Sequence, residues 1–229
     1  VFSIRAPRPM LRAPWIIGRF TTAAAATQDM IEGLKPLYST VLRPAIGVFV
    51  LLRVHPTHLT VLGVFIFAAA GWFVAMDRWY VAAICITVGA LLDGWDGLLA
   101  RETNRTSTLG AVLDSSCDRL TEIAWLSGVL YYFAVRPAFG VWPVVLVVGA
   151  LSGSMMVSYV KARAEGAGIE CRGGLMQRPE RIILLGVPLL IGPQAMIWAL
   201  GITTVLTYAT FLQRIAVVRK NIVEKDRSR

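Results

Sequence analysis

Six apolar segments, five of them long enough to cross a lipid bilayer and the fifth in order shorter, follow one another along this chain of 229 residues. They cover approximately residues 57–76, 79–101, 108–134, 141–166, 178–192 and 194–219. A membrane-spanning helix needs about 20 apolar residues. Only 16% of the residues are charged, whereas a soluble domain carries about 25%. The sequence therefore predicts an all-α integral membrane protein with six transmembrane helices.

The positions of Lys and Arg predict the orientation of these helices. Of the 23 Lys and Arg residues, 20 lie in segments on one side of the predicted membrane. Only Arg78 and Arg136 lie in loops on the other side, and Arg119 lies inside the third segment. Because cytoplasmic loops are enriched in Lys and Arg, both termini are expected to be cytoplasmic. The net charge of +9 then reflects topology, and no nucleic acid is expected as a partner because no basic stripe with interleaved aromatic residues is present.

The residues outside the spans divide into three parts. Residues 1–28 contain arginine but no acid and are expected to form an N-terminal tail, disordered or on the membrane surface, with an organellar transit peptide as the alternative. Residues 29–54 mix apolar and charged side chains and are expected to form a juxtamembrane amphipathic helix in the interface. Residues 55–220 are expected to form the six-span domain, and residues 221–229 a C-terminal cytoplasmic tail.

Four aspartates lie inside the predicted spans. Asp93 and Asp96 stand three residues apart near the end of the second span, and Asp114 and Asp118 stand four apart near the start of the third. Each spacing places both side chains on one helix face, and the short connection is expected to pack the two helices antiparallel and adjacent. Four unpaired carboxylates at mid-membrane would cost on the order of 10 kcal/mol. Such residues indicate a functional site.

The chemistry of this group favours hard divalent cations. Carboxylate oxygens without histidine suit Mg²⁺ or Mn²⁺, and two such ions would balance four carboxylates and clamp the attacking and leaving oxygens of a phosphoryl transfer. Gly97 and Gly110 lie beside the acidic faces, where a ligand could approach closely; small-residue helix packing is the alternative explanation. The three cysteines share no metal-ligand spacing, so no zinc site is expected.

The aspartates belong to a longer pattern, Asp93-x-x-Asp96-Gly97-x-x-Ala100-Arg101-x8-Gly110-x3-Asp114-x3-Asp118. This pattern matches without a gap the signature of the CDP-alcohol phosphotransferase family, which the chain resembles over about residues 30–219. The resemblance implies that the four aspartates bind two divalent ions, Mg²⁺ or Mn²⁺, that hold the pyrophosphate of a CDP-linked lipid. It also implies that Asp118 is the general base that takes the proton of the acceptor hydroxyl.

Further residues and partners follow from the same resemblance. The implied contacts to the CDP-lipid are Thr57, Thr60, Gly97, Arg101, Ser107 and Gly110. The element from Pro56 to Thr60 resembles the nucleotide-facing motif of the family, with Thr57 at a position where Asn or Asp is usual. The resemblance implies CDP-diacylglycerol as the donor, membrane lipids as surroundings, a homodimer, and a bacterial plasma membrane with the active site facing the cytoplasm.

A group of cations predicts a phosphorylated acceptor. Arg forms bidentate pairs with phosphate, and the expected phosphate ligands are Arg119, Lys161, Arg163, Arg178 and Arg181. The runs 158–165 and 177–182 are similar to those of the bacterial phosphatidylinositol-phosphate synthases of this family, which implies inositol 1-phosphate as the acceptor. Glycerol 3-phosphate is the alternative because it needs a similar pocket, whereas free inositol or serine fits these cations less well. Membrane topology is the alternative origin of the charges in 161–181.

Two other classes of membrane protein also carry intramembrane carboxylates. An intramembrane prenyltransferase has two Asp motifs, but they lie far apart in the sequence, whereas Asp96 and Asp114 here are close. A divalent-cation transporter would need polar residues that continue to the outer face, and the outer halves of these segments are nearly all apolar. Both classes are therefore disfavoured.

Overall fold

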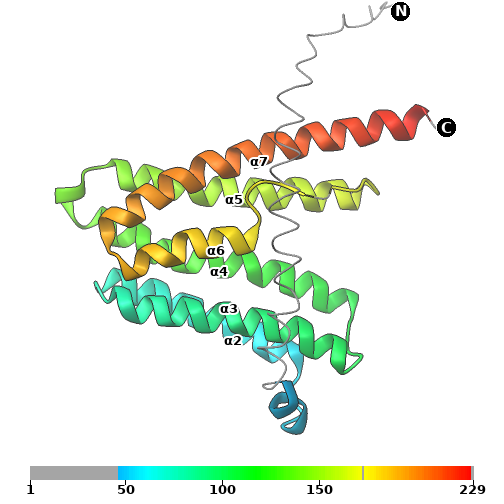
Figure 1. The fold of residues 1–229 in the computed structure, drawn as a ribbon, viewed down its shortest axis with the longest axis horizontal. Helices are drawn as coiled ribbons and strands as arrows, with labels where there is room; N and C mark the ends of the chain where they lie inside the picture. Colours follow the sequence, from blue (N-terminus) through cyan, green and yellow to red (C-terminus); the bar gives the residue numbers. More distant parts are fainter. Residues whose placement is uncertain (1–45, 172, 228–229) are drawn as a thin grey trace, which may run out of the picture.

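The computed structural model describes residues 46–171 and 173–227, and every regular element in these ranges is helical (Figure 1). The helices are α2 (Pro56–Ala75), α3 (Trp79–Glu102), α4 (Thr108–Ala134), η1 (Pro137–Phe139), α5 (Trp142–Gly166), α6 (Arg178–Gly186), η2 (Val187–Leu190) and α7 (Pro193–Arg227). The first four predicted apolar segments are α-helices with nearly the predicted bounds. The fifth is divided between α6 and the 3-10 helix η2, and the helix of the sixth continues beyond residue 219 to Arg227. The predicted tail 1–28 and most of the juxtamembrane segment 29–54 lie outside the described residues, and 46–51 is a short helical turn.

Four of these helices, α2, α3, α5 and α7, are long and apolar enough to cross a membrane, which indicates a multi-pass membrane protein. The helix α4 has 27 residues, about 40 Å at 1.5 Å per residue, but its first half contains several charged side chains. The helix α6 has 9 residues and η2 has 4, together about 20 Å, which is short of the roughly 30 Å hydrocarbon core. The count of six spans therefore stays a prediction.

The helix α2 organises the first half of the bundle. It packs against both α3 and α4, whereas the backbones of α3 and α4 have almost no close contact with each other. The expectation that α3 and α4 pack directly against each other is therefore wrong, because α2 holds them apart. In the second half α5 packs along α7, and α4 joins the halves through α5. The separation of α3 from α4 leaves room for a site between their acidic faces.

Close packing between α2 and α4 depends on two glycines. A Cβ atom built on Gly128 would lie 1.9 Å from the carbonyl oxygen of Gly71, and one built on Gly71 would lie 2.7 Å from that of Ala124. Both partners are backbone atoms, so neither can move aside without moving its helix. Small residues allow this approach of two membrane helices, and a larger side chain at either position would force them apart.

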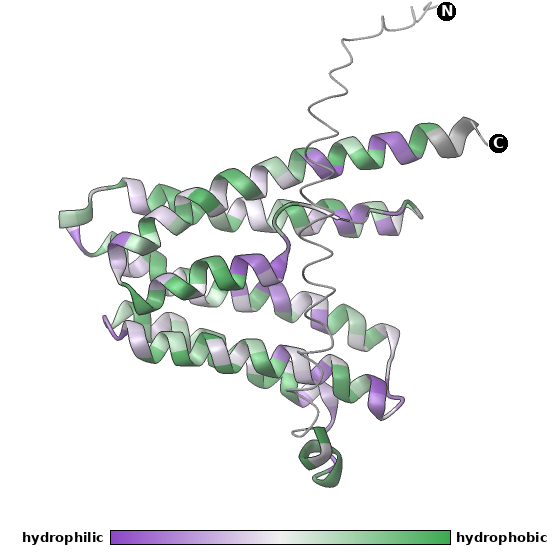
Figure 2. Ribbon diagram, viewed as in Figure 1, coloured by the Kyte–Doolittle hydropathy of each residue, from purple (hydrophilic) through white to green (hydrophobic). Residues whose placement is uncertain are grey.

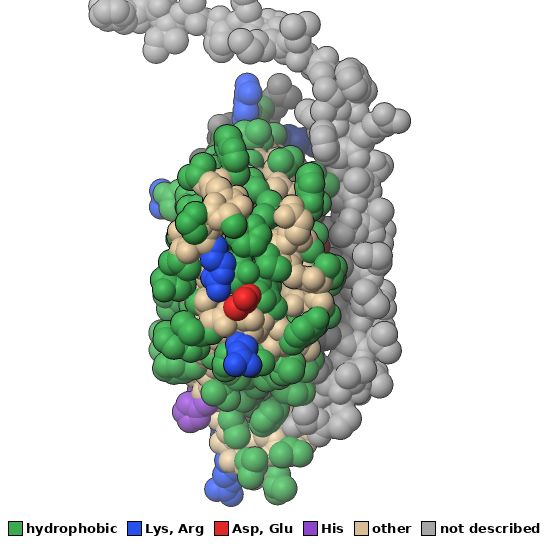
Figure 3. All heavy atoms as spheres, turned by 90° about the vertical axis from the view of Figure 1, so that its left-hand side faces the viewer, with side chains coloured by type: hydrophobic (Ala, Val, Ile, Leu, Met, Phe, Trp, Pro, Cys, Tyr) green, Lys and Arg blue, Asp and Glu red, His purple; other side chains and the backbone are tan. Residues whose placement is uncertain are grey.

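Polar residues gather toward one end of the bundle. Figure 2 shows hydrophilic residues concentrated around the first turns of α6 and the neighbouring parts of α4. The opposite end carries few charges (Figure 3), and its loops contain Asp77, Arg78 and Arg136. Two of these side chains have local partners: the indole of Trp79 donates to Asp77 at 2.7 Å, and the guanidinium of Arg136 lies 3.8 Å from the ring centroid of Tyr132. The functional chemistry therefore lies at the end where α3 leads into α4.

Candidate active site

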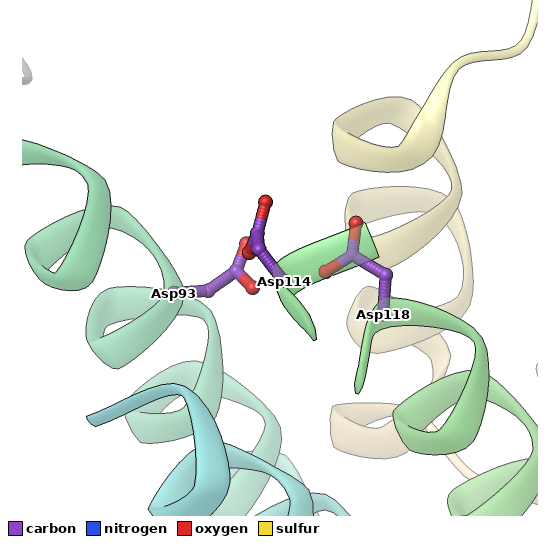
Figure 4. A group of neighbouring side chains, drawn as sticks. All are labelled: Asp93, Asp114 and Asp118. Carbon is purple, nitrogen blue, oxygen red and sulfur yellow. The ribbon is translucent and has the colours of Figure 1, made fainter. Parts of the chain in front are cut away.

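Three predicted metal ligands converge from two helices. Asp93 on α3 points toward Asp114 and Asp118 on α4 (Figure 4), and each carboxylate offers an oxygen within 4.8 Å of those of the other two. The helix α4 begins behind Ser107, whose Oγ accepts from the backbone N–H of Gly110 at 3.0 Å. The two aspartates then follow one helical turn apart, so both face α3. The structure brings three carboxylates into a volume that suits a cation.

The fourth predicted ligand, Asp96, lies apart from this group. It is buried, with 6% of its surface exposed, and the hydroxyl of Thr60 on α2 donates to its Oδ2 at 2.5 Å. This contact links the start of α2 to the acidic face of α3. Asp96 is therefore one helical turn from Asp93 but directed toward a neighbouring cavity.

The predicted CDP-lipid contacts all line that neighbouring cavity. Its volume is about 330 Å³, and its walls include Thr57, Thr60, Gly97, Arg101, Ser107 and Gly110 together with Asp96 and Asp114. A Cβ on Gly97 would lie 3.8 Å from the guanidinium of Arg101, so the glycine leaves the floor of the cavity open beside a cation. His55 and Arg105, which sequence reasoning missed, also face this space. We call it the nucleotide cavity.

A second cavity of about 350 Å³ lies on the other side of the acidic group. Its walls include Asp114, Asp118 and four of the five predicted acceptor-phosphate residues: Arg119, Lys161, Arg178 and Arg181. The fifth, Arg163, is exposed on α5 and lines neither of the two cavities. We call this space the cationic cavity. Asp114 lines both cavities, so they meet at the carboxylates.

The side chain of Arg181 is committed to a buried ion pair. Its Nε lies 2.9 Å from Glu122 Oε1 and its Nη2 lies 3.3 Å from Glu122 Oε2, while Nη1 donates to the backbone oxygen of Met176. Ser154 on α5 also donates to Glu122. The side chain of Arg181 is 4% exposed and that of Glu122 is 11% exposed. Arg181 therefore fixes α6 to α4 and has little capacity left for a ligand.

A further cation, Arg214 on α7, lines the cationic cavity and was missed by sequence reasoning. Arg214 is only 6% exposed, and its guanidinium donates to the backbone oxygens of Gly173 and Val157 at 3.1 and 2.7 Å. These contacts hold the charge in place without neutralising it. A buried arginine within an apolar helix was the available signal, but it was attributed to membrane topology.

The acidic group fits a hard divalent cation. Its donors are carboxylate oxygens, which Mg²⁺ and Mn²⁺ prefer. In addition, Asp118 Oδ1 is buried and makes no hydrogen bond, although Arg178 Nη1 approaches it to 2.5 Å.

The chain is similar in sequence to known proteins of one enzyme family. The sequence profile of the family described as CDP-alcohol phosphatidyltransferase matches residues 53–215. An archaetidylinositol phosphate synthase from Pyrococcus horikoshii is 35% identical over 172 residues, which cover 75% of this chain and 87% of that protein. A phosphatidylinositol phosphate synthase from Mycobacterium marinum is 37% identical over 145 residues, covering 58% of this chain and 60% of that protein.

Two crystal structures of a phosphatidylinositol phosphate synthase from Mycobacterium tuberculosis have the same fold. The structure with CDP-DAG bound has a TM-score of 0.72 and 28% identity, covering 78% of this chain and 94% of that one. The complex with manganese and citrate has a TM-score of 0.70 and 29% identity, covering 77% and 88%. The family is metal-dependent. With its profile matched from residue 53 to residue 215, this chain belongs to the CDP-alcohol phosphatidyltransferase family of transferases.

Proposed function

We propose that the protein transfers the phosphatidyl group of CDP-diacylglycerol to the hydroxyl of a phosphorylated polyol, with inositol 1-phosphate as the acceptor and CMP as the leaving product. One observation carries this proposal: the nucleotide cavity and the cationic cavity meet at Asp114, whose carboxylate lies within 4.8 Å of those of Asp93 and Asp118. A donor and an acceptor bound in the two cavities would present their reacting groups to the same acids. Such placement supplies much of the rate gain in a two-substrate reaction.

The nucleotide cavity fits the CDP end of the donor. Arg101 provides a cation beside the open surface at Gly97, and the hydroxyls of Thr57 and Ser107 lie on its walls. The proposed metal ligands are Asp93, Asp96, Asp114 and Asp118, for two ions of Mg²⁺ or Mn²⁺. Bound there, the ions would neutralise the pyrophosphate and stabilise the departing CMP.

The cationic cavity fits the phosphate of the acceptor. Arg119, Lys161, Arg178 and Arg214 line it, and Lys161 is half exposed on α5, where a soluble ligand could reach it. Arg181 contributes to this pocket by its ion pair with Glu122, which holds the wall in place. Asp114, Asp118, Glu122 and Glu165 line the same cavity, and Lys161 lies 3.8 Å from Glu165. The cluster of cations still favours a phosphorylated acceptor over a neutral polyol.

Asp118 is the proposed general base. It lies on the boundary between the acidic group and the cationic cavity, so an acceptor held by its phosphate would place a hydroxyl near this carboxylate. Asp118 would take the hydroxyl proton, and the acceptor oxygen would attack the phosphorus that carries diacylglycerol. The bond from that phosphorus to the bridging oxygen would break as CMP leaves. No covalent enzyme intermediate is needed.

Membership of the CDP-alcohol phosphatidyltransferase family argues against the prenyltransferase and transporter alternatives. Glycerol 3-phosphate remains the alternative acceptor because it presents the same phosphate to the same cations. The relatives named phosphatidylinositol phosphate synthase support inositol 1-phosphate. We further propose six spans with both termini in the cytoplasm, a bacterial plasma membrane and a homodimer.

Release of labelled CMP from CDP-diacylglycerol tests the proposal. We expect release that needs Mg²⁺ or Mn²⁺ and is fastest with inositol 1-phosphate in a panel that includes glycerol 3-phosphate and free inositol. Faster release with glycerol 3-phosphate would identify the alternative acceptor. If no member of the panel supports CMP release in the presence of either metal, the proposed reaction is wrong.

A further inference from the structure

Arg178, the first residue of α6, reaches across to acids of two other helices. Its Nη1 lies 2.7 Å from each carboxylate oxygen of Asp93 on α3 and 2.5 Å from Asp118 Oδ1 on α4. Its Nη2 donates to the hydroxyl of Thr121 at 3.3 Å. The side chain is 19% exposed. The guanidinium therefore lies where the acidic group would bind a cation.

The guanidinium satisfies these carboxylates incompletely. One Nη atom carries two N–H groups, but Nη1 of Arg178 is in contact with three carboxylate oxygens. Asp118 Oδ1 is the oxygen left without a hydrogen bond. A divalent cation can coordinate about six oxygens at once, so it would satisfy the group better than the arginine does.

Arg178 also lines the cationic cavity beside Arg119 and Lys161, so open space lies next to its side chain. Its neighbour on the same helix face, Arg181, is instead fixed by its pair with Glu122. A short movement of one side chain would therefore transfer a positive charge from the acids to the space proposed for the acceptor phosphate.

We propose that Arg178 is a tethered counter-cation of the acidic group, displaced by divalent metal and thereby released to the acceptor cavity. Metal loading then completes the phosphate pocket, so that the acceptor binds well only after the metal. This inference rests on the proposed metal site and does not depend on which phosphorylated polyol is the acceptor.

Titration of the purified full-length protein with Mn²⁺ by calorimetry tests the inference. Because the variant Arg178→Gln has no cation to displace, we expect its Kd for Mn²⁺ to fall about tenfold, equivalent to about 1.4 kcal/mol. The control Arg163→Gln removes the same charge from an exposed site on α5 and should change the Kd less than about twofold. In EDTA the Arg178→Gln variant should melt at a lower temperature than the wild type, because its carboxylates lack a counter-cation.

A merely structural role for Arg178 predicts the opposite sign. If the arginine only holds Asp93 and Asp118 in position, its removal weakens Mn²⁺ binding or leaves it unchanged, and either result overturns the inference. If the wild-type protein itself binds no Mn²⁺, the proposed metal site fails as well. Binding by the wild type without a gain in Arg178→Gln would remove the inference alone.

A second measurement needs no variant. Phenylglyoxal modifies accessible guanidinium groups, and peptide mass spectrometry can separate the extent of modification at Arg178 from that at Arg181. Saturating Mn²⁺ should raise modification of Arg178 several-fold and leave Arg181 unchanged, since its pair with Glu122 lies outside the metal group. Modification of Arg178 that does not rise with metal would overturn the proposed displacement.

Discussion

The ion pair between Arg181 and Glu122 gives the sharpest test of how this site is built. The sequence assigns Arg181 to the acceptor phosphate, but its Nε lies 2.9 Å from Glu122 in a buried setting. At an effective dielectric constant of about 20, two unit charges at this distance attract by about 6 kcal/mol before desolvation is subtracted. Removal of one partner from a buried pair leaves the other charge uncompensated and costs about 3–5 kcal/mol.

Two single variants and their combination separate structure from ligand binding. We expect Arg181→Met and Glu122→Gln each to destabilise the protein by about 3–5 kcal/mol, seen as a melting temperature lower by on the order of 10 °C. The double variant should lose much less than the sum, because it leaves no unpaired charge. Thermal unfolding in one detergent, with all four proteins measured together, gives the coupling energy.

The kinetics of the double variant then decide the role of Arg181. If this arginine only fixes α6 to α4, the double variant should keep an acceptor KM within about threefold of the wild type, a difference below about 1 kcal/mol. A rise of about a hundredfold in acceptor KM, with folding restored, would show that Arg181 binds the phosphate itself. Additive losses of stability would refute the claim that the two charges compensate each other.

Three further outcomes are expected. Asp118→Asn should lower CMP release by about 100-fold or more, since a positioned base contributes about that much, while binding of CDP-diacylglycerol persists; full turnover would remove Asp118 from the mechanism. Arg214→Gln should raise the acceptor KM without changing that of the CDP-lipid in steady-state assays over both substrates, and an unchanged acceptor KM would contradict its place in the phosphate pocket. Gly128→Ala should destabilise the protein by at least about 1–3 kcal/mol in thermal unfolding because its Cβ would lie 1.9 Å from Gly71 O, whereas Gly201→Ala meets only Leu146 at 4.0 Å and should be neutral or better.

The sequence predicted the positions of the helices well, because the length of an apolar run and the residues that end it are properties of a short segment. The fifth segment was expected to end at residue 192, and Gly192 adopts a φ of +127° before α7 begins at Pro193. Spacing also placed Asp114 and Asp118 on one face of α4, and the same arithmetic would have added Glu122, which lies one turn further. Its charge was overlooked because its partner, Arg181, is distant in sequence.

Long-range partners were not predictable in this way. The expectation that α3 and α4 touch rested on their short connection, but Gly71 and Gly128 bring α2 and α4 so close that α2 holds α3 away. The approach of two helices depends on side chains in both, which a single segment does not reveal. The partners of Arg214 were likewise unpredictable, since its hydrogen bonds to Gly173 and Val157 come from two other parts of the chain.

Two ion pairs join α6 to α4, and they differ in how deeply they are buried. Arg178 and Arg181 stand three residues apart on α6, and they pair with Asp118 and Glu122, which stand four apart on α4. In the Arg181–Glu122 pair the two side chains are 4% and 11% exposed and hydrogen-bonded to each other. Separating them would leave buried charges without a partner. In the Arg178–Asp118 pair both side chains are 19% exposed.

Asp118 and Arg178 also line the cationic cavity. In the displacement proposed above, a divalent cation would replace Arg178 as the partner of Asp118. On successive turns, one arginine–carboxylate pair would then be a permanent attachment and the other an exchangeable one. Since both pairs line the cavity, their difference in burial is what distinguishes them. The less buried pair, which includes Asp118 of the metal group, would serve the reaction while the other holds the geometry.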